Sequence, residues 1–179
     1  MKIKLILLCA CTLFLVSCKD DADPSVLEGC CGNLPLNAQV GEITHIYIAN
    51  IFTPNGDGIN DLMMLNGSIF LNVTAFELKD KEGNVVHSYS SDIGQKDFAL
   101  WNGEIDGEIK KGFYTYSLTV VTFDGTEETF EGGICNYPCD VDIAEERISA
   151  DNCTFSTQTF NGYFDSTIPS GEQNGCFAE

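Results

Sequence analysis

Oxygen-bearing side chains are concentrated in one short stretch of the chain, residues 53–61, with the sequence Thr-Pro-Asn-Gly-Asp-Gly-Ile-Asn-Asp. Pro54 fixes its own φ, and the two glycines of the stretch allow the positive φ that a tight loop needs. Calcium binds about six to eight oxygen ligands in loops of this kind. We therefore predict a calcium site with these ligands: Thr53, Asn55, Asp57, the backbone carbonyl of Ile59, and Asp61.

The same loop has a metal-free alternative. The position at which an EF-hand loop carries a bidentate glutamate is Met64. A further ligand must therefore be water or come from another loop, with Asp106 or Asp124 as candidates. In the alternative, the Asn and Asp side chains accept hydrogen bonds from nearby backbone N–H groups and hold a turn between two strands. The sequence leaves both interpretations open.

Residues 1–17 indicate export. Lys2 and Lys4 precede an apolar run that is too short for a permanent membrane-spanning helix, as in a secretory signal peptide. Leu15-Val16-Ser17-Cys18 resembles a bacterial lipobox, in which Cys18 carries lipid and begins the mature protein. The acidic residues that follow resemble the surface-export signal of lipoproteins in Bacteroidetes. We expect a lipid-anchored protein of the outer membrane that faces the cell exterior; an ordinary signal peptide and a merely soluble tether are the alternatives.

The chain is strongly acidic, with 27 acidic and nine basic residues and a formal net charge of −18. Removal of the signal deletes two lysines and no acidic residue, so the mature charge is −20. Such a surface repels nucleic acid and tolerates divalent cations. We therefore predict no DNA or RNA partner.

Six cysteines follow Cys18, and an even number in an exported chain predicts disulfides. They are Cys30, Cys31, Cys135, Cys139, Cys153 and Cys176. Because the adjacent Cys30 and Cys31 cannot easily pair with each other, we expect each to reach the C-terminal tail, with the connectivity otherwise open. Cys135 and Cys139 could instead be half of a zinc site, but neither histidine lies near a second thiol pair in the sequence.

No group of residues indicates an active site. Nucleophilic catalysis needs a Ser, Cys or Thr beside a base that a third group orients. His45 and His87 both fall in strand-like runs, without a serine elbow or a metal-binding helix around them. We therefore predict a non-enzymatic protein. Trp101 could stack on a sugar, but a single Trp beside Phe98 and Leu100 favours a place in the core.

Short strands and turns must position these residues. Runs rich in β-branched and aromatic residues occupy 43–52, 73–79, 85–89, 113–122 and 128–134. Apolar and polar residues alternate along 113–122, which predicts a half-buried strand. Asp124-Gly125 then predicts a hairpin to the next run. Short strands at this spacing predict an all-β protein and a β-sandwich.

Four motifs occur in an order and spacing that resemble one family. They are Asn50–Asp61, Trp101-Asn102-Gly103, Gly112–Tyr116 and Asp124-Gly125. Over about residues 44–135 the chain is similar to the gliding-motility-associated C-terminal domain of Bacteroidetes. The resemblance implies an immunoglobulin-like sandwich that serves as a type B sorting signal for the type IX secretion system.

The domain organisation combines this resemblance with the composition. We predict a lipoprotein signal peptide (1–17), an acidic tether (18–42), an immunoglobulin-like β-sandwich (43–135) and a cysteine-rich C-terminal appendage (136–179). The appendage has too few apolar residues for a second core. We therefore expect a fold in which disulfides staple it to the sandwich.

The chain departs from the family pattern in its lipobox, its short upstream segment, its cysteine-rich tail and the lack of an Arg-Trp pair within 78–84. Our main functional prediction is therefore a surface-exposed outer-membrane lipoprotein module. Its role would be structural or in protein interaction, in adhesion, gliding or an outer-membrane complex, with an unidentified outer-membrane or cell-surface protein as partner. A type IX sorting domain is the first alternative and a glycan-binding lipoprotein the second.

Overall fold

The computed structural model describes residues 27–139, 148–172 and 177. Its strands are β1 (Leu36–Val40), β2 (Thr44–Ile48), β3 (Ile51–Phe52), β4 (Met63–Lys79), β5 (Val85–Trp101), β6 (Glu104–Ile105), β7 (Glu108–Ile109), β8 (Gly112–Thr122), β9 (Glu127–Asn136), β10 (Thr159–Phe160) and β11 (Tyr163–Phe164). A 3-10 turn, η2 (Ser156–Gln158), precedes β10. The all-β prediction is confirmed, and no helix in the described ranges could cross a membrane. The predicted signal peptide, Cys18 and Cys176 lie outside the described residues.

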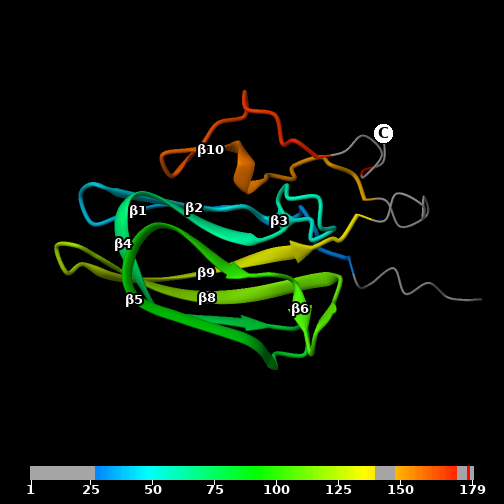
Figure 1. Ribbon diagram of the computed structural model, residues 1–179, viewed down its shortest axis with the longest axis horizontal. Helices are drawn as coiled ribbons and strands as arrows, with labels where there is room; N and C mark the ends of the chain where they lie inside the picture. The colour runs from blue at the N-terminus through cyan, green and yellow to red at the C-terminus, as the bar shows by residue number, and fades with distance from the viewer. Residues whose placement is uncertain (1–26, 140–147, 173–176, 178–179) are drawn as a thin grey trace, which may run out of the picture.

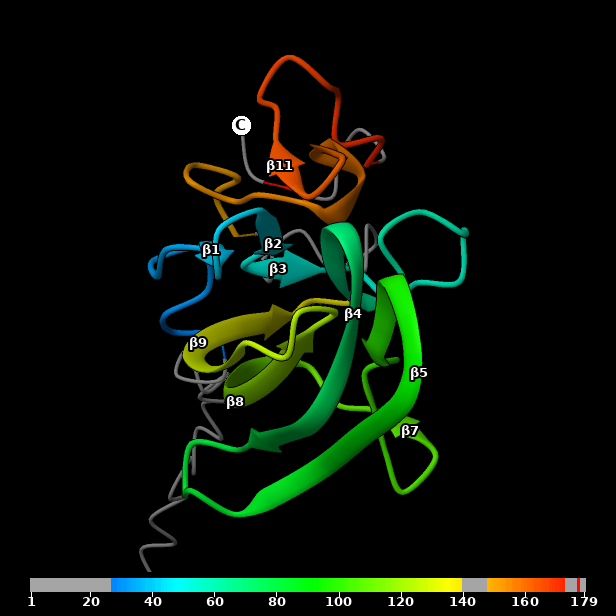
Figure 2. The same cartoon turned by 90° about the vertical axis from the view of Figure 1, so that its left-hand side faces the viewer.

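One seven-stranded sheet dominates the molecule, with the order β1-β2-β4-β8-β9-β3 and with β5 beside β4. The long strand β4 bends, as Figures 1 and 2 show. Its first part pairs with β2, through Leu65–Gly67, and its second part pairs with β8, through Leu71–Lys79. Gly67 is the last residue of the part that pairs with β2, and a Cβ there would be 2.7 Å from the carbonyl oxygen of Lys96. β4 therefore belongs to two layers, an arrangement consistent with the expected sandwich.

The core lies between these layers. Ile46, Leu65 and Phe98 from one layer and Phe76 and Leu118 from the other belong to a single buried cluster. The alternation predicted for 113–122 is confirmed, since the side chains with even numbers from 114 to 120 are buried. The predicted hairpin is also confirmed, because β8 pairs with β9 in antiparallel register. We call β1 to β9 the β-domain.

The sheet is larger than the sequence patterns indicate. β1 pairs with β2 although it lies within the range assigned to the tether, 18–42. β4 begins ten residues before the expected run at Val73, and β5 continues twelve residues past Tyr89. Much of β5 is exposed, so it carries little of the apolar alternation that marks a half-buried strand.

The described residues after 147, which we call the tail, lie across one side of the β-domain (Figures 1 and 2). β11 contacts β2 and β4, and η2 contacts β4. Beneath the tail is a second, smaller buried cluster that includes Ile51, Tyr137 and Phe155. Phe155 is the one apolar side chain of the described tail that is fully buried.

Candidate functional site

The loop of residues 53–61, which we call the signature loop, joins β3 to β4 and is held by its own side chains. The Asp61 carboxylate accepts hydrogen bonds from the N–H of Gly56, at 2.8 Å, and of Gly58, at 2.7 Å. Asn55 Oδ1 accepts from the Asp57 N–H at 3.0 Å, and Asp57 Oδ1 accepts from the Ile59 N–H at 2.8 Å. These bonds are those of the metal-free alternative, in which short polar side chains replace backbone turns.

The predicted calcium ligands are divided between two environments. Asn55 and Asp57 are exposed, whereas Thr53 is fully buried. Thr53 donates its hydroxyl hydrogen to Glu172 Oε1 at 2.7 Å, and the carbonyl of Ile59 lies 3.5 Å from the same hydroxyl. Within the described ranges, no three His, Cys, Asp and Glu side chains are close enough together to hold a metal. Calcium at this loop stays a prediction.

Glu172 is the residue of this site that sequence reasoning missed. Its Oε1 also accepts a hydrogen bond from Asn60 Nδ2 at 2.6 Å, while Oε2 is buried without a hydrogen-bond partner among the described residues. Burial raises the pKa of Glu172 above its ordinary value, and the charges of Asp57 and Asp61 act in the same direction. The hydrogen bonds from Thr53 and Asn60 oppose this shift. A carboxyl group of the tail is thus enclosed against the signature loop. No local sequence pattern predicts this contact.

The two suggested extra ligands lie elsewhere. Asp124 Oδ1 accepts a hydrogen bond from the Thr126 N–H at 3.1 Å and contacts the Thr122 hydroxyl, so Asp124 shapes the β8–β9 turn. Asp106 has a φ of 55° and belongs to the turn between β6 and β7. Both residues belong to turns away from the signature loop.

Two buried asparagines join the β-domain to the tail. Asn50 is 0% exposed; its Nδ2 donates to the carbonyl of Asn152 at 2.8 Å, and its Oδ1 accepts from the Thr154 N–H at 2.8 Å. Asn60 donates to the carbonyl of Ser170 at 3.0 Å and accepts from the Thr157 N–H at 3.2 Å. Both residues belong to the first of the four motifs. Its polar positions therefore hold the tail as well as the turn.

Disulfides make the same connection covalently. Cys30 bonds to Cys135 at the end of β9, and Cys31 bonds to Cys153 in the tail. The adjacent cysteines thus diverge, and Cys30 ends inside the β-domain rather than in the tail. Cys139 is disulfide-bonded too. Because Cys135 and Cys139 are both in disulfides, the zinc alternative at this pair is wrong.

Trp101 lies in the core and not at the surface. Its side chain is 3% exposed, its Nε1 donates to the carbonyl of Glu104 at 3.0 Å, and its ring meets Phe52 and Tyr114 edge-on. A surface sugar platform at Trp101 is therefore wrong, and the core position is confirmed. The nearby Asn136 donates from Nδ2 to the carbonyls of Gly103 and Lys110, both at 2.9 Å.

The strand order and the signature loop define a class of protein. It is a small all-β domain with, at one end, a turn that is held by its own side chains. The chain belongs to the CHU_C type IX secretion signal domain family, whose model matches residues 46–135. The match runs from β2 to the penultimate residue of β9 and confirms the resemblance seen in the four motifs. The tail lies outside it. Among curated proteins, no match to the chain is found.

Proposed function

We propose that the β-domain acts as a sorting signal, recognised by the type IX secretion machinery, and that it delivers this protein to the cell surface. One observation carries the proposal: the family match takes in β2 to β9 and the whole signature loop. A sorting signal must present a fixed shape to a partner protein. The exposed part of the signature loop supports this requirement, because its turns are held by hydrogen bonds to Asn55, Asp57 and Asp61.

A lipid anchor at Cys18 completes the proposal. The anchor would retain the exported protein at the outer membrane, on the exterior face, and the β-domain would supply the route. Support comes from the lipobox-like residues 15–18 and from the acidic residues that follow them. In this proposal the lipid retains the protein at the outer membrane, whereas the β-domain determines its passage to the exterior.

The proposal assigns no catalytic step. His87 Nε2 lies 2.9 Å from the carbonyl oxygen of Leu100, and the His45 ring packs on Tyr163. In the described part of the chain, neither imidazole is hydrogen-bonded to a nucleophilic side chain, and Cys30, Cys31 and Cys135 are in disulfides. These contacts support a binding role rather than an enzymatic one.

The test separates the two signals. The full chain and its Cys18→Ala variant are expressed in a Bacteroidetes host with intact type IX secretion and in the same host without it. We expect the variant to reach the medium in the intact host and to stay inside the cell envelope in the deficient one. Protease shaving and fractionation measure both. Surface exposure of the wild-type chain that survives loss of type IX secretion would overturn the sorting role and favour the lipoprotein route alone.

A matched pair of glycine variants makes the test local. Gly58 and Gly83 both have a φ of about 85°, and a Cβ at either would meet no atom within 4 Å. Gly58→Ala strains the signature loop, whereas Gly83→Ala strains the turn between β4 and β5 by a similar amount. We expect only Gly58→Ala to reduce export. Equal export of the two variants would remove the signature loop from the recognition surface.

A further inference from the structure

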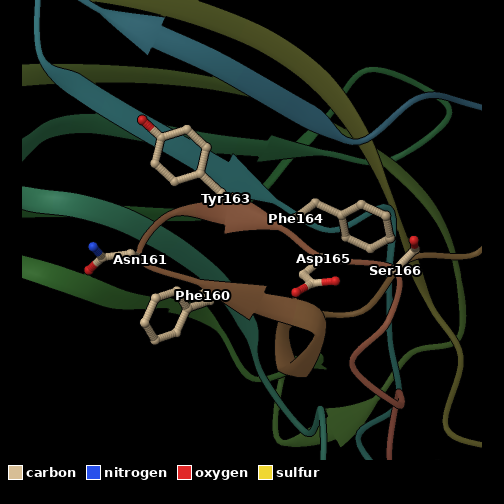
Figure 3. A pocket seen from close by; sticks show the side chains of 6 residues that line it. All are labelled: Phe160, Asn161, Tyr163, Phe164, Asp165 and Ser166. Carbon is tan, nitrogen blue, oxygen red and sulfur yellow. The ribbon is translucent and has the colours of Figure 1, made fainter.

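Two aromatic side chains stand exposed on the β10–β11 hairpin of the tail. The side chain of Phe160 is 73% exposed and that of Tyr163 is 51% exposed, although the two residues pair across the hairpin. With Asn161 at the tip and Asp165 and Ser166 beyond β11, they line a hollow of about 510 Å³, drawn in Figure 3. Exposed aromatic rings grouped with polar side chains are a common mark of a binding site.

The hairpin that carries these rings is firmly mounted on the β-domain. Gly162 has a φ of 77°, and a Cβ at this position would lie 2.5 Å from the Ser68 nitrogen, so the hairpin turn touches the backbone of β4. The Tyr163 ring lies 4.1 Å from the His45 ring, and Phe164 stacks on Tyr47 at 5.6 Å, as centroid distances. A ligand would therefore meet rings that are already in place, which reduces the entropy lost on binding.

The polar side chains around the hollow keep unused hydrogen-bonding capacity. Asp165 Oδ1 accepts from the N–H of Thr167 at 2.8 Å and from its hydroxyl at 2.6 Å, whereas Oδ2 makes no hydrogen bond within the described residues. These bonds hold the pKa of Asp165 below its ordinary value, so the group is a carboxylate near neutral pH. Asn161 Oδ1 accepts from the Lys96 ammonium, which leaves its NH₂ group for a ligand.

This combination selects the class of ligand. Flat apolar faces next to a carboxylate, a hydroxyl and an amide suit a molecule that carries C–H faces and many hydroxyl groups. The formal charge of −18 and the Asp165 carboxylate disfavour an anionic ligand. A purely apolar partner would leave the carboxylate desolvated and unpaired. A neutral sugar offers C–H faces for the rings and hydroxyl groups for the carboxylate, the hydroxyl and the amide together.

We propose that the β10–β11 hairpin binds a neutral saccharide of all-equatorial pyranose units, with a ring face against Phe160 and Tyr163 and hydroxyl groups bonded to Asp165, Ser166 and Asn161. Such units direct their C–H bonds to the two faces and their hydroxyls to the rim, which matches rings flanked by polar groups. The hairpin lies outside residues 46–135, so this binding is separate from the sorting role.

The experiment measures binding of cellohexaose and xylohexaose to the full-length chain with its disulfides intact, by titration calorimetry. Phe160→Ser should lower the affinity at least about tenfold, since a stacked ring face is lost. The control is Phe123→Ser, because Phe123 is 71% exposed but lies at the β8–β9 turn. We expect the control to bind like the wild type, and Ser166→Ala to weaken binding a few-fold.

Three outcomes overturn the proposal, two with the neutral sugars and one with an anionic probe. One is that neither hexasaccharide binds the wild-type chain. Another is that Phe160→Ser and Phe123→Ser bind equally well, which would place any sugar contact elsewhere. Polygalacturonate serves as the anionic probe, and stronger binding of it than of cellohexaose would contradict the neutral class. Equal melting midpoints of the two Phe variants establish that a loss of binding is not a loss of fold.

Discussion

The β-domain and the tail are built by different means. The β-domain has a continuous sheet and one core between two layers, with side chains such as Phe76 and Leu118 almost fully enclosed. The described tail has a hairpin of two-residue strands, one buried apolar side chain, and many hydrogen bonds to the domain beneath it. Hydrophobic burial therefore holds the first region, whereas polar anchors and a disulfide hold the second.

The region that identifies the family and the region specific to this chain are therefore held together differently. The region that matches the family carries its own core, so it can keep its shape whatever follows it. The tail takes its shape from Asn50, Asn60 and Cys31, all of which lie before residue 62. Changes in the core of the β-domain should therefore affect both regions, whereas changes at the anchor side chains should affect the tail alone.

The largest expected effect comes from the core. Phe76→Ala should lower the free energy of unfolding by about 3–5 kcal/mol, because it leaves a cavity in the fully buried cluster. Both regions should lose protection from amide hydrogen exchange together, since the tail depends on the sheet. Phe123→Ala, at an exposed position, should change the stability by no more than about 0.5 kcal/mol. Retained protection of the tail in the Phe76 variant would show that the tail folds independently.

Removal of one disulfide should produce the opposite pattern. The double variant Cys31→Ser, Cys153→Ser frees the tail from a link across 122 residues, and should weaken its docking by about 2–4 kcal/mol. Limited proteolysis should then cut the tail while β8 and β9 stay protected. The matched control is the double variant Cys30→Ser, Cys135→Ser, which breaks a link across 105 residues but leaves the tail bond intact. Equal release of the tail in both variants would contradict the division of roles.

Glu172 makes the contact between the tail and the signature loop depend on pH. Because its pKa is raised in the folded protein, the folded state keeps this proton at a pH where the unfolded state has released it. The stability is then greatest below the ordinary pKa of 4.5 and declines as the pH rises through the folded pKa. Hydrogen exchange of residues 148–172 from about pH 4 to about pH 8 measures this decline. Glu172→Gln should flatten it, whereas Glu127→Gln, at an exposed position of β9, should not.

The smallest expected effect is that of calcium at the signature loop. With a dissociation constant of about 10⁻³ M, 1 mM calcium stabilises the folded chain by about 0.4 kcal/mol over EDTA. Thermal melts in the two conditions test this, and Asp57→Asn, which keeps a hydrogen-bond acceptor but loses charge, should abolish the difference. Identical midpoints for the wild type in calcium and EDTA would leave the metal-free turn as the whole account.

Local patterns predicted the elements that bury one face. Residues 113–122 alternate cleanly because one face of β8 meets the core, and Asp124-Gly125 supplies the turn. β1 escaped prediction because it is only five residues long, and the middle of β5, residues 90–97, escaped because most of its side chains are exposed. The bend of β4 was missed for another reason: it is defined by pairing with β2 and with β8, which are contacts between residues distant in the sequence.

The candidate site also has a part that the sequence predicted and a part that it did not. The turn of the signature loop was visible in the sequence because the backbone hydrogen bonds that Asn55, Asp57 and Asp61 accept span at most five residues. Glu172 was not visible, since it meets Thr53 across 119 residues. The exposed hairpin at Phe160 was also missed, because two-residue strands leave no periodic pattern. Trp101 shows the converse, since its apolar neighbours in sequence already indicated its burial.

The disulfide between Cys30 and Cys135 determines which strands bear a force that pulls on the N-terminal side of the chain. A force that pulls on the chain upstream of residue 27 reaches Cys30 and passes directly into β9, which is hydrogen-bonded to β8 along its length. Where such a load runs along β9, the pairing with β8 opposes it in shear, and many backbone hydrogen bonds must yield together. β1 and β2 follow Cys30 in the chain and are bypassed by the load. A protein tethered at its N-terminus and pulled by flow or by a moving cell would thus resist unzipping strand by strand.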